Sequence, residues 1–159
     1  MAKISRFRFL IKLLIMALFF NLLPFPKSLA AVTPPLTSCY IRIDNPHISK
    51  YILRTQGILA VKVNARSQCN RPMRDLILTV EIHKTGLLRD YRLKRTQFKV
   101  AGRIFANEVI KNEDTYVKCI NQQPSSYYGV AYASAVIDGK LKKTLKVTSA
   151  KNVRLACGN

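Results

Sequence analysis

The chain has 159 residues, 48% of them hydrophobic, and a formal net charge of +19. This length is sufficient for one ordinary domain with a single hydrophobic core, and it excludes two large cores. The excess of Lys and Arg attracts polyanions and repels cations, which disfavours cationic partners and leaves wall polymers, acidic polysaccharides, anionic lipids and nucleic acid open.

The first thirty residues have the three parts of a secretory signal peptide. A basic start precedes an apolar run, in which residues 13–20 contain no polar side chain. Spanning a bilayer takes about 20 apolar residues, and Pro24 and Pro26 end this run early. Ser28 and Ala30 are the small residues that a signal peptidase requires. We therefore expect cleavage after Ala30 and secretion, in preference to a membrane anchor.

After the signal peptide we expect a proline-containing linker at 31–38 and a single domain at 39–159. Residues 36–39 resemble a lipobox, but they lie about a dozen residues beyond the apolar run, which disfavours a lipid on Cys39. Removing the signal peptide takes away five basic residues and no acidic one, which lowers the net charge from +19 to +14.

The four cysteines of the chain predict two disulfides, because their number is even and the chain is expected in an oxidising compartment. Sequence alone allows three connectivities. We favour Cys39 with Cys69 and Cys119 with Cys157, since each pair would join the flanks of a neighbouring strand group and the second would hold the C-terminus. No CxxC pair occurs and neither histidine has ligand spacing to a cysteine, so we expect no metal site.

Hydrophobic and polar residues alternate in two segments, which is the pattern of half-buried β-strands. The odd-numbered positions of 59–65 and the even-numbered positions of 76–83 are expected to face inward. Similar but weaker patterns predict further strands at 39–43, 91–100, 115–120, 127–137, 141–148 and 153–157.

Turn-forming residues separate these strands, and Asp138-Gly139 predicts a two-residue hairpin turn with Gly139 at positive φ. The pattern predicts an all-β fold without helices, an antiparallel β-sandwich of immunoglobulin-like type with about seven to eight strands. A barrel stays open as an alternative. The other expected turns lie at 70–72, 85–86, 112–114 and 123–126.

The segment 101–112 and the aromatic residues of the core do not follow from the alternation alone. Residues 101–112 fit a short helix as well as a strand. The chain has no Trp, so Tyr132 with Val130 and Val136 is expected to fill the core volume that Trp occupies in immunoglobulin domains, and we favour a core position for Tyr127 and Tyr128 as well.

Polar residues do not form a catalytic pattern. In 44–47, Asp-Asn-Pro-His, a structural turn is favoured over an Asp44–His47 pair. His83 is expected to be solvated, and the acidic residues near 108–114 are expected on the surface. We therefore predict no catalytic residue, no cofactor and a non-enzymatic protein.

Basic residues concentrate in two segments that could bind a polyanion. Arg92 and Lys94 are expected to share one strand face, and Lys140, Lys142 and Lys146 another; the two sets form one stripe if their strands are neighbours. Lysines that merely guard strand edges are the alternative. The candidate polyanion-binding residues are Arg89, Arg92, Lys94, Arg95, Lys99, Arg103, Lys140, Lys142, Lys143 and Lys146.

Several motifs of the chain recur in one family. They are DNPHIS at 44–49, YVKC at 116–119, YGVAYA at 128–133 and the final Cys157. In these features the chain resembles small secreted actinobacterial proteins of unassigned function, from which it departs in lacking Trp and in its positive charge. The resemblance implies a β domain with two disulfides outside the cell, and it implies no activity or site.

These observations together predict a secreted or cell-surface binding module whose cationic face engages anionic envelope or host polymers, without specific recognition of nucleic acid. A cationic membrane-active effector is the first alternative, and a secreted enzyme with an unrecognised site is the second. The oligomeric state stays open.

Overall fold

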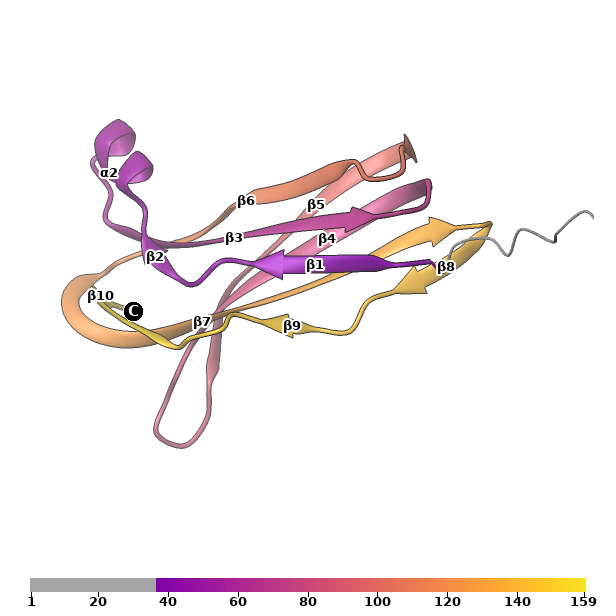
Figure 1. Cartoon of the computed structure of the whole chain (residues 1–159). Helices are drawn as coiled ribbons and strands as arrows, with labels where there is room; N and C mark the ends of the chain where they lie inside the picture. The colour runs from indigo at the N-terminus through magenta and orange to yellow at the C-terminus, as the bar shows by residue number, and fades with distance from the viewer. Residues whose placement is uncertain (1–36) are drawn as a thin grey trace, which may run out of the picture. The chain divides into compact units, whose positions relative to one another are not determined.

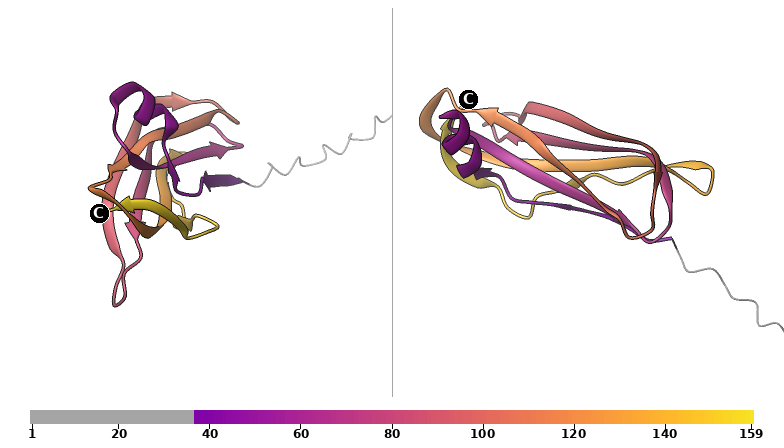
Figure 2. Two further views of the ribbon diagram at one scale, coloured as in Figure 1. Left: turned by 90° about the vertical axis from the view of Figure 1, so that its left-hand side faces the viewer. Right: turned by 90° about the horizontal axis from the view of Figure 1, so that it is seen from above.

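The computed structural model describes residues 37–159, in which two antiparallel sheets pack face to face (Figure 1, Figure 2). The predicted signal peptide and its cleavage site lie outside the described residues. So does the predicted linker, except for Thr37 and Ser38, which have no regular structure.

The first sheet is built around β3, which has β6 on one edge and β1 followed by β2 on the other. β1 and β3 pair with Cys39 opposite Cys69 and Ile43 opposite Ala65. The strands are β1 (Cys39–Ile43), β2 (His47–Ile48), β3 (Ala60–Cys69) and β6 (Val109–Lys118).

The second sheet has the order β5, β4, β7, and its far edge is formed by three short strands that pair in succession with β7. Figure 1 shows β8 and β9 following one another along that edge. The strands are β4 (Met73–Lys84), β5 (Tyr91–Ile104), β7 (Asn121–Ile137), β8 (Lys140–Lys143), β9 (Val147–Thr148) and β10 (Val153–Gly158).

One short helix, α2 (Lys50–Gln56), connects β2 to β3 and was not predicted. The side chain of Ser49 caps its first turn by accepting a hydrogen bond from the Ile52 N–H, at 3.3 Å. Gly57 ends it in the left-handed conformation, with φ of 65°. Ile52 is buried, so a single apolar contact point fixes the helix on the domain.

The core lies between the two sheets and follows the predicted alternation. Val61 and Val63 of β3 and Leu78 and Val80 of β4 are fully buried. The aromatic residue of the core is Tyr127, whose hydroxyl donates to the backbone carbonyl of Cys157.

The prediction that Tyr132 fills the core with Val130 and Val136 is wrong for Tyr132 and Val136, whereas Val130 is buried. These residues lie on the opposite row of β7 from Tyr127, and Tyr132 and Val136 are only half-buried. Both rows of β7 are rich in apolar residues, so alternation alone did not show which row faces inward.

Both predicted disulfides are present. Cys39 is bonded to Cys69 across the paired ends of β1 and β3, and Cys119, which directly follows β6, is bonded to Cys157 near the end of β10. None of the four cysteines is free, so the sulfur of Cys39 is already used and cannot carry a lipid in this form.

The hairpin turn at Asp138 and Gly139 is confirmed, with φ of 50° and 72° respectively. Two other expected turns are wrong, because 112–114 lies inside β6 and 123–126 inside β7. β4 pairs with β7 only from Tyr127 onward, so the earlier residues of β7 have a strand partner, β10, on one side only. Pro124, which has no N–H to donate, is therefore tolerated there. The ambiguous segment 101–112 contains the end of β5, a turn and the start of β6.

The all-β antiparallel sandwich is therefore the fold of the described residues, while its immunoglobulin-like type stays a prediction. Within 37–159 no helix has the length and apolar character needed to cross a bilayer.

Candidate functional site

A carboxylate is buried on the solvent-facing side of the second sheet. Glu81 of β4 points away from the core, since its strand neighbours Val80 and Ile82 point inward, yet only 4% of the residue is exposed. A charge in such a position must be covered and compensated by neighbouring side chains, because burying an unpaired charge is costly. The residues that do this come from β4, β5 and β7.

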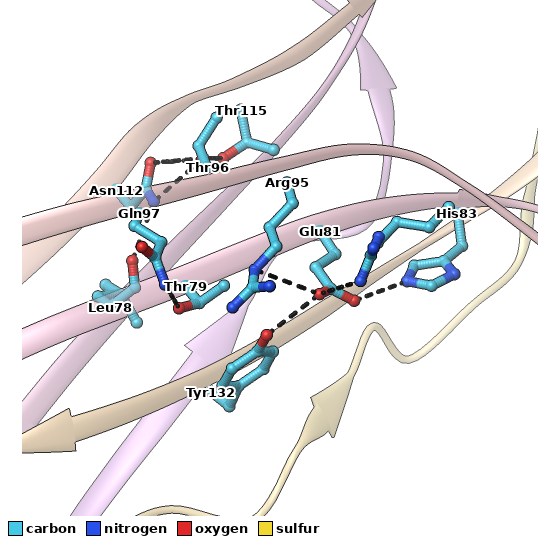
Figure 3. A network of polar contacts seen from close by, with 11 residues as sticks. Leu78, Thr79, Glu81, His83, Arg95, Thr96, Gln97, Asn112, Thr115 and Tyr132 are labelled. Carbon is cyan, nitrogen blue, oxygen red and sulfur yellow. Dashed lines mark hydrogen bonds and ion pairs between the residues drawn. The ribbon is translucent and has the colours of Figure 1, made fainter.

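Three of these partners form hydrogen bonds with Glu81, and those of Tyr132 and His83 are the shortest. The Tyr132 hydroxyl donates to Oε1 at 3.1 Å, and Nε2 of His83 lies 2.9 Å from Oε2. Figure 3 shows Tyr132 and His83 approaching the carboxylate from different sides. The prediction that His83 is simply solvated is therefore wrong, because its side chain is only 18% exposed and is paired.

Two arginines of β5 complete the shell. Arg92 places Nη1 3.4 Å from Oε1 of Glu81, and Arg95 places Nε 3.8 Å from the same oxygen. Their side chains remain 54% and 44% exposed. Because a guanidinium has five N–H donors, each arginine can bind Glu81 and still present donors to an anion in solution.

An irregularity in β5 makes this convergence possible. Arg95 lies directly opposite Glu81, and the register then shifts so that Arg92 lies opposite His83. In a regular ladder, two residues three positions apart would point to opposite faces. The β-bulge restores Arg92 to the outer face beside Arg95.

The charges around Glu81 alter its pKa. Burial by itself raises the pKa, but hydrogen bonds from His83 and Tyr132 and charge interactions with His83 and Arg92 outweigh burial. The pKa of Glu81 therefore lies below its ordinary value, and the group is ionised at neutral pH.

Two cations lie against the ring of Tyr132. The guanidinium carbon of Arg95 is 5.9 Å and the ammonium of Lys146 is 5.5 Å from the ring centre, both within cation–π range. Burial and the neighbouring Glu81 carboxylate raise the pKa of Tyr132, so its hydroxyl stays a hydrogen-bond donor. We call Glu81, Arg92, Arg95, Tyr132 and Lys146 the Glu81 surface.

A second tyrosine extends this arrangement along β7. The ring of Tyr128 stacks on His83 with centres 5.0 Å apart, and its hydroxyl donates to Asp90 at 2.8 Å. Burial, with the Asp90 carboxylate second, raises the pKa of Tyr128 to about 12. Tyr128 is thus not a core residue: it holds the imidazole of His83 in place beside Glu81.

A separate polar cluster, also drawn in Figure 3, links the two sheets behind this surface. Asn112 of β6 is 1% exposed, and its Nδ2 donates to the Leu78 carbonyl of β4 at 3.2 Å. Thr96 and Thr115 hydrogen-bond to each other and contact Asn112. This cluster is structural, since it fastens β6 to the opposite sheet where no ladder joins β5 and β6.

The strands of the two predicted basic segments are not neighbours, and the segments meet only where Arg95 and Lys146 lie against the ring of Tyr132. β5 lies at one edge of the second sheet and β8 at the other, with β4 and β7 between them. The predicted shared face of Arg92 and Lys94 is also wrong, because the bulge places Lys94 opposite the inward-facing Ile82. Lys99 is opposite Ile77 and belongs to the outer row with Arg95.

The lysines of the second segment also separate. Lys140 and Lys142 lie opposite Ile137 and Ala135 on the row that faces the core, whereas Lys146 follows the end of β8 and lies over Tyr132 on the outer face. Directly opposite residues of an antiparallel pair share a face, so Lys143, opposite Ser134, belongs to the outer row.

The remaining predicted residues are peripheral. Arg89 lies 5.4 Å from the ring of Tyr91 in the β4–β5 connection, and Arg103 lies 5.3 Å from the ring of Phe105 at the end of β5. Neither contacts the Glu81 surface through an interaction found among the described residues.

The turn at 44–47 has the predicted structural role. Oδ2 of Asp44 accepts a hydrogen bond from the Asn64 side chain, and Nδ1 of His47 lies 3.1 Å from the Asn45 carbonyl. Asp44 and His47 thus make separate contacts and form no acid–base pair. Within the described part of the chain, no three His, Cys, Asp or Glu residues cluster as metal ligands.

Comparison of the chain with protein-family models and with curated protein sequences found no match.

Proposed function

We propose that this protein is a non-enzymatic binding module whose Glu81 surface engages anionic polymers of the cell envelope or of a host. The observation that carries the proposal is the pair of half-exposed arginines, Arg92 and Arg95, held by one buried carboxylate. Glu81 fixes the arginines while about half of each side chain stays exposed to solvent.

Fixed arginines are suited to sulfate, phosphate or carboxylate groups on a polymer. A guanidinium bound on one side loses less conformational freedom when an anion arrives, so less of the interaction energy is lost to ordering. Lys99, Lys143 and Lys146 extend the positive charge along the same outer face. Together they give a surface that can contact several anionic groups of one chain.

We further propose that the protein works outside the cytoplasm, after removal of residues 1–30. Two disulfides in a domain of this size are typical of proteins in oxidising compartments. Anionic wall polymers and acidic polysaccharides occur in that location, which agrees with the charge of the Glu81 surface.

Retention on immobilised heparin, a polysulfated model polymer, tests the binding proposal. We expect the double variant Arg92→Gln/Arg95→Gln to bind about tenfold more weakly, an effect of about 1.4 kcal/mol. The matched control is Lys94→Gln/Lys111→Gln, which removes the same charge from residues outside the Glu81 surface. If both variants lose retention equally, net charge alone is responsible and the proposal fails.

A second candidate function is supported by the tip of the β4–β5 hairpin, which projects from the sheets (Figure 1). Leu87 and Leu88 are fully exposed there and are followed by Arg89. Adjacent exposed leucines beside cations are suited to insertion into an anionic membrane surface.

This membrane-active alternative predicts dye release from phosphatidylglycerol vesicles at micromolar protein. It also predicts that Leu87→Ser/Leu88→Ser abolishes the release, while Arg92→Gln/Arg95→Gln leaves most of it. The absence of dye release by the unaltered protein would eliminate this alternative without affecting the heparin result.

A further inference from the structure

A cleft of about 890 Å³ opens between the two sheets, with β1 on one side and β7 and β8 on the other. Most of its walls are inward-facing residues, whereas Glu81 is on the outer side of the second sheet, and of the outer-row lysines named above Lys143 alone reaches its rim. Sites that bury one small organic ligand have volumes of about 300–1,000 Å³. The cleft is therefore large enough to hold such a molecule.

The walls of the cleft are mainly apolar. Ile41 of β1 and Leu76 of β4 line it from the two sheets, and Ala133 and Ala135 of β7 line it with short side chains. Larger residues at these two positions of β7 would occupy the space. Leu145, which is 89% exposed, lies at the rim and provides apolar surface that a ligand could cover.

The rim of the cleft carries positive charge. Lys140 and Lys142 of β8 line it, and the register of β7 with β8 places them opposite Ile137 and Ala135, on the row that faces the inter-sheet space. Both lysines are exposed at the edge of the sheet, where charges also keep a strand from pairing with another chain, and their row places two ammonium groups beside the apolar walls.

One acidic residue also lines the cleft, but it is already paired. Asp138 contacts Arg71 at 3.1 Å through Oδ1. The lysines are therefore not neutralised by an ion pair among the described residues, and the rim keeps a net positive charge. An apolar cavity with a cationic mouth is complementary to an amphiphile with an apolar chain and an anionic head.

We infer that this cleft binds a long-chain fatty acid, with its alkyl chain along Ala133 and Ala135 and its carboxylate at Lys140 and Lys142. The site can be tested separately from the polymer-binding proposal, because it uses neither Arg92 nor Arg95 and shares only Lys143 at its rim with that surface. Charge-assisted contacts to two ammonium groups fix the head, and burial of the chain supplies most of the affinity.

Titration with palmitate below its micellar concentration tests this inference by calorimetry. We expect one molecule bound per chain. The variant Ala135→Phe replaces a methyl group in the cleft wall by a phenyl ring that occupies the cleft. We expect it to weaken palmitate binding at least about tenfold. Val136→Phe, on the opposite row of the same strand, is the matched control and is expected to bind normally.

The role of the lysines is tested separately. Lys140→Glu/Lys142→Glu is expected to weaken palmitate binding about tenfold, whereas Lys94→Glu/Lys111→Glu makes the same charge change elsewhere and leaves binding unchanged. Hexadecyltrimethylammonium, which has the same chain and a cationic head, should not bind. Equal binding of this cation, or palmitate binding that Ala135→Phe does not reduce, would overturn the inference.

Two further measurements keep the test decisive. If Ala135→Phe does not unfold cooperatively, Ala135→Val replaces it with a smaller volume change. Heparin retention of Lys140→Glu/Lys142→Glu is compared with that of Arg92→Gln/Arg95→Gln. If palmitate binds as expected but Arg92→Gln/Arg95→Gln does not weaken heparin retention, the polymer-binding proposal alone has failed. If heparin retention changes as expected but palmitate does not bind, the fatty-acid inference alone has failed.

Discussion

The arginines of β5 and the lysines of β8 look alike in sequence and differ in structure. Arg92 and Arg95 lie on the outer face of the second sheet and share the buried carboxylate of Glu81. Lys140 and Lys142 lie on the inward row of the opposite edge, and no ion pair between described residues includes them. Two basic clusters of equal charge thus have different surroundings. The arginines are held in place by a carboxylate, whereas the lysines have no counter-charge among the described residues.

The largest effect that separates the two clusters should come from Glu81→Gln. Removing the buried charge leaves Arg92 and Arg95 without their counter-ion, and we expect the free energy of unfolding to fall by about 1–2 kcal/mol. The value is below that of a fully buried pair because the arginines are half-exposed. Urea unfolding measures it.

The control for this prediction is Lys142→Gln, which changes one charge on the β8 side. We expect its unfolding free energy to match that of the unaltered protein within about 0.5 kcal/mol. Equal losses in the two variants would show that Glu81 does not anchor the arginines.

Acid should have a smaller effect on stability, to which Glu81 beside the β5 arginines contributes. The pKa of Glu81 is lower in the folded protein than its ordinary value of 4.5, so the unfolded chain takes up the proton first as the pH falls. The stabilisation by ionised Glu81 is therefore complete at neutral pH and is lost as the pH falls below 4.5 through the folded pKa.

Urea unfolding at several pH values between neutral and acid checks this prediction. The unaltered protein should lose more stability on acidification than Glu81→Gln does, whereas Lys142→Gln should follow the unaltered protein. A Glu81→Gln profile with the same slope would contradict the lowered pKa.

The smallest effect should appear when charge is kept and geometry changed. Arg95→Lys preserves the charge but loses the planar guanidinium that contacts both Glu81 and the ring of Tyr132, so we expect heparin binding to weaken about threefold. Lys142→Arg, the reverse change on β8, should leave heparin retention unaltered. Elution salt concentrations on one column compare the two variants directly.

Much of the scaffold could be predicted because period-two alternation reports burial directly. The bounds of β1 and the inward row of β4 agree with the prediction, and both disulfides join the expected cysteines. The helix α2 was missed because it has one buried residue, too few to produce a helical period. Its signals were local: Ser49 before the first turn and Gly57 after the last.

The candidate site could not be predicted, because it depends on pairings between distant segments. In sequence, Glu81 and His83 belong to an ordinary outer row, and nothing near them indicates that Tyr132 will cover them. The decisive feature is the bulge in β5, which reverses the parity of Arg92 relative to Lys94.

The two disulfides have a consequence for an environment that contains proteases. They enclose residues 39–69 and 119–157, and the first of these loops includes the exposed helix α2. A single backbone cut in α2 would leave both fragments joined through Cys39 and Cys69, with the β1–β3 pairing still in register. Damage at this exposed segment would therefore nick the domain without releasing a piece of it, and the cut would become visible only after reduction.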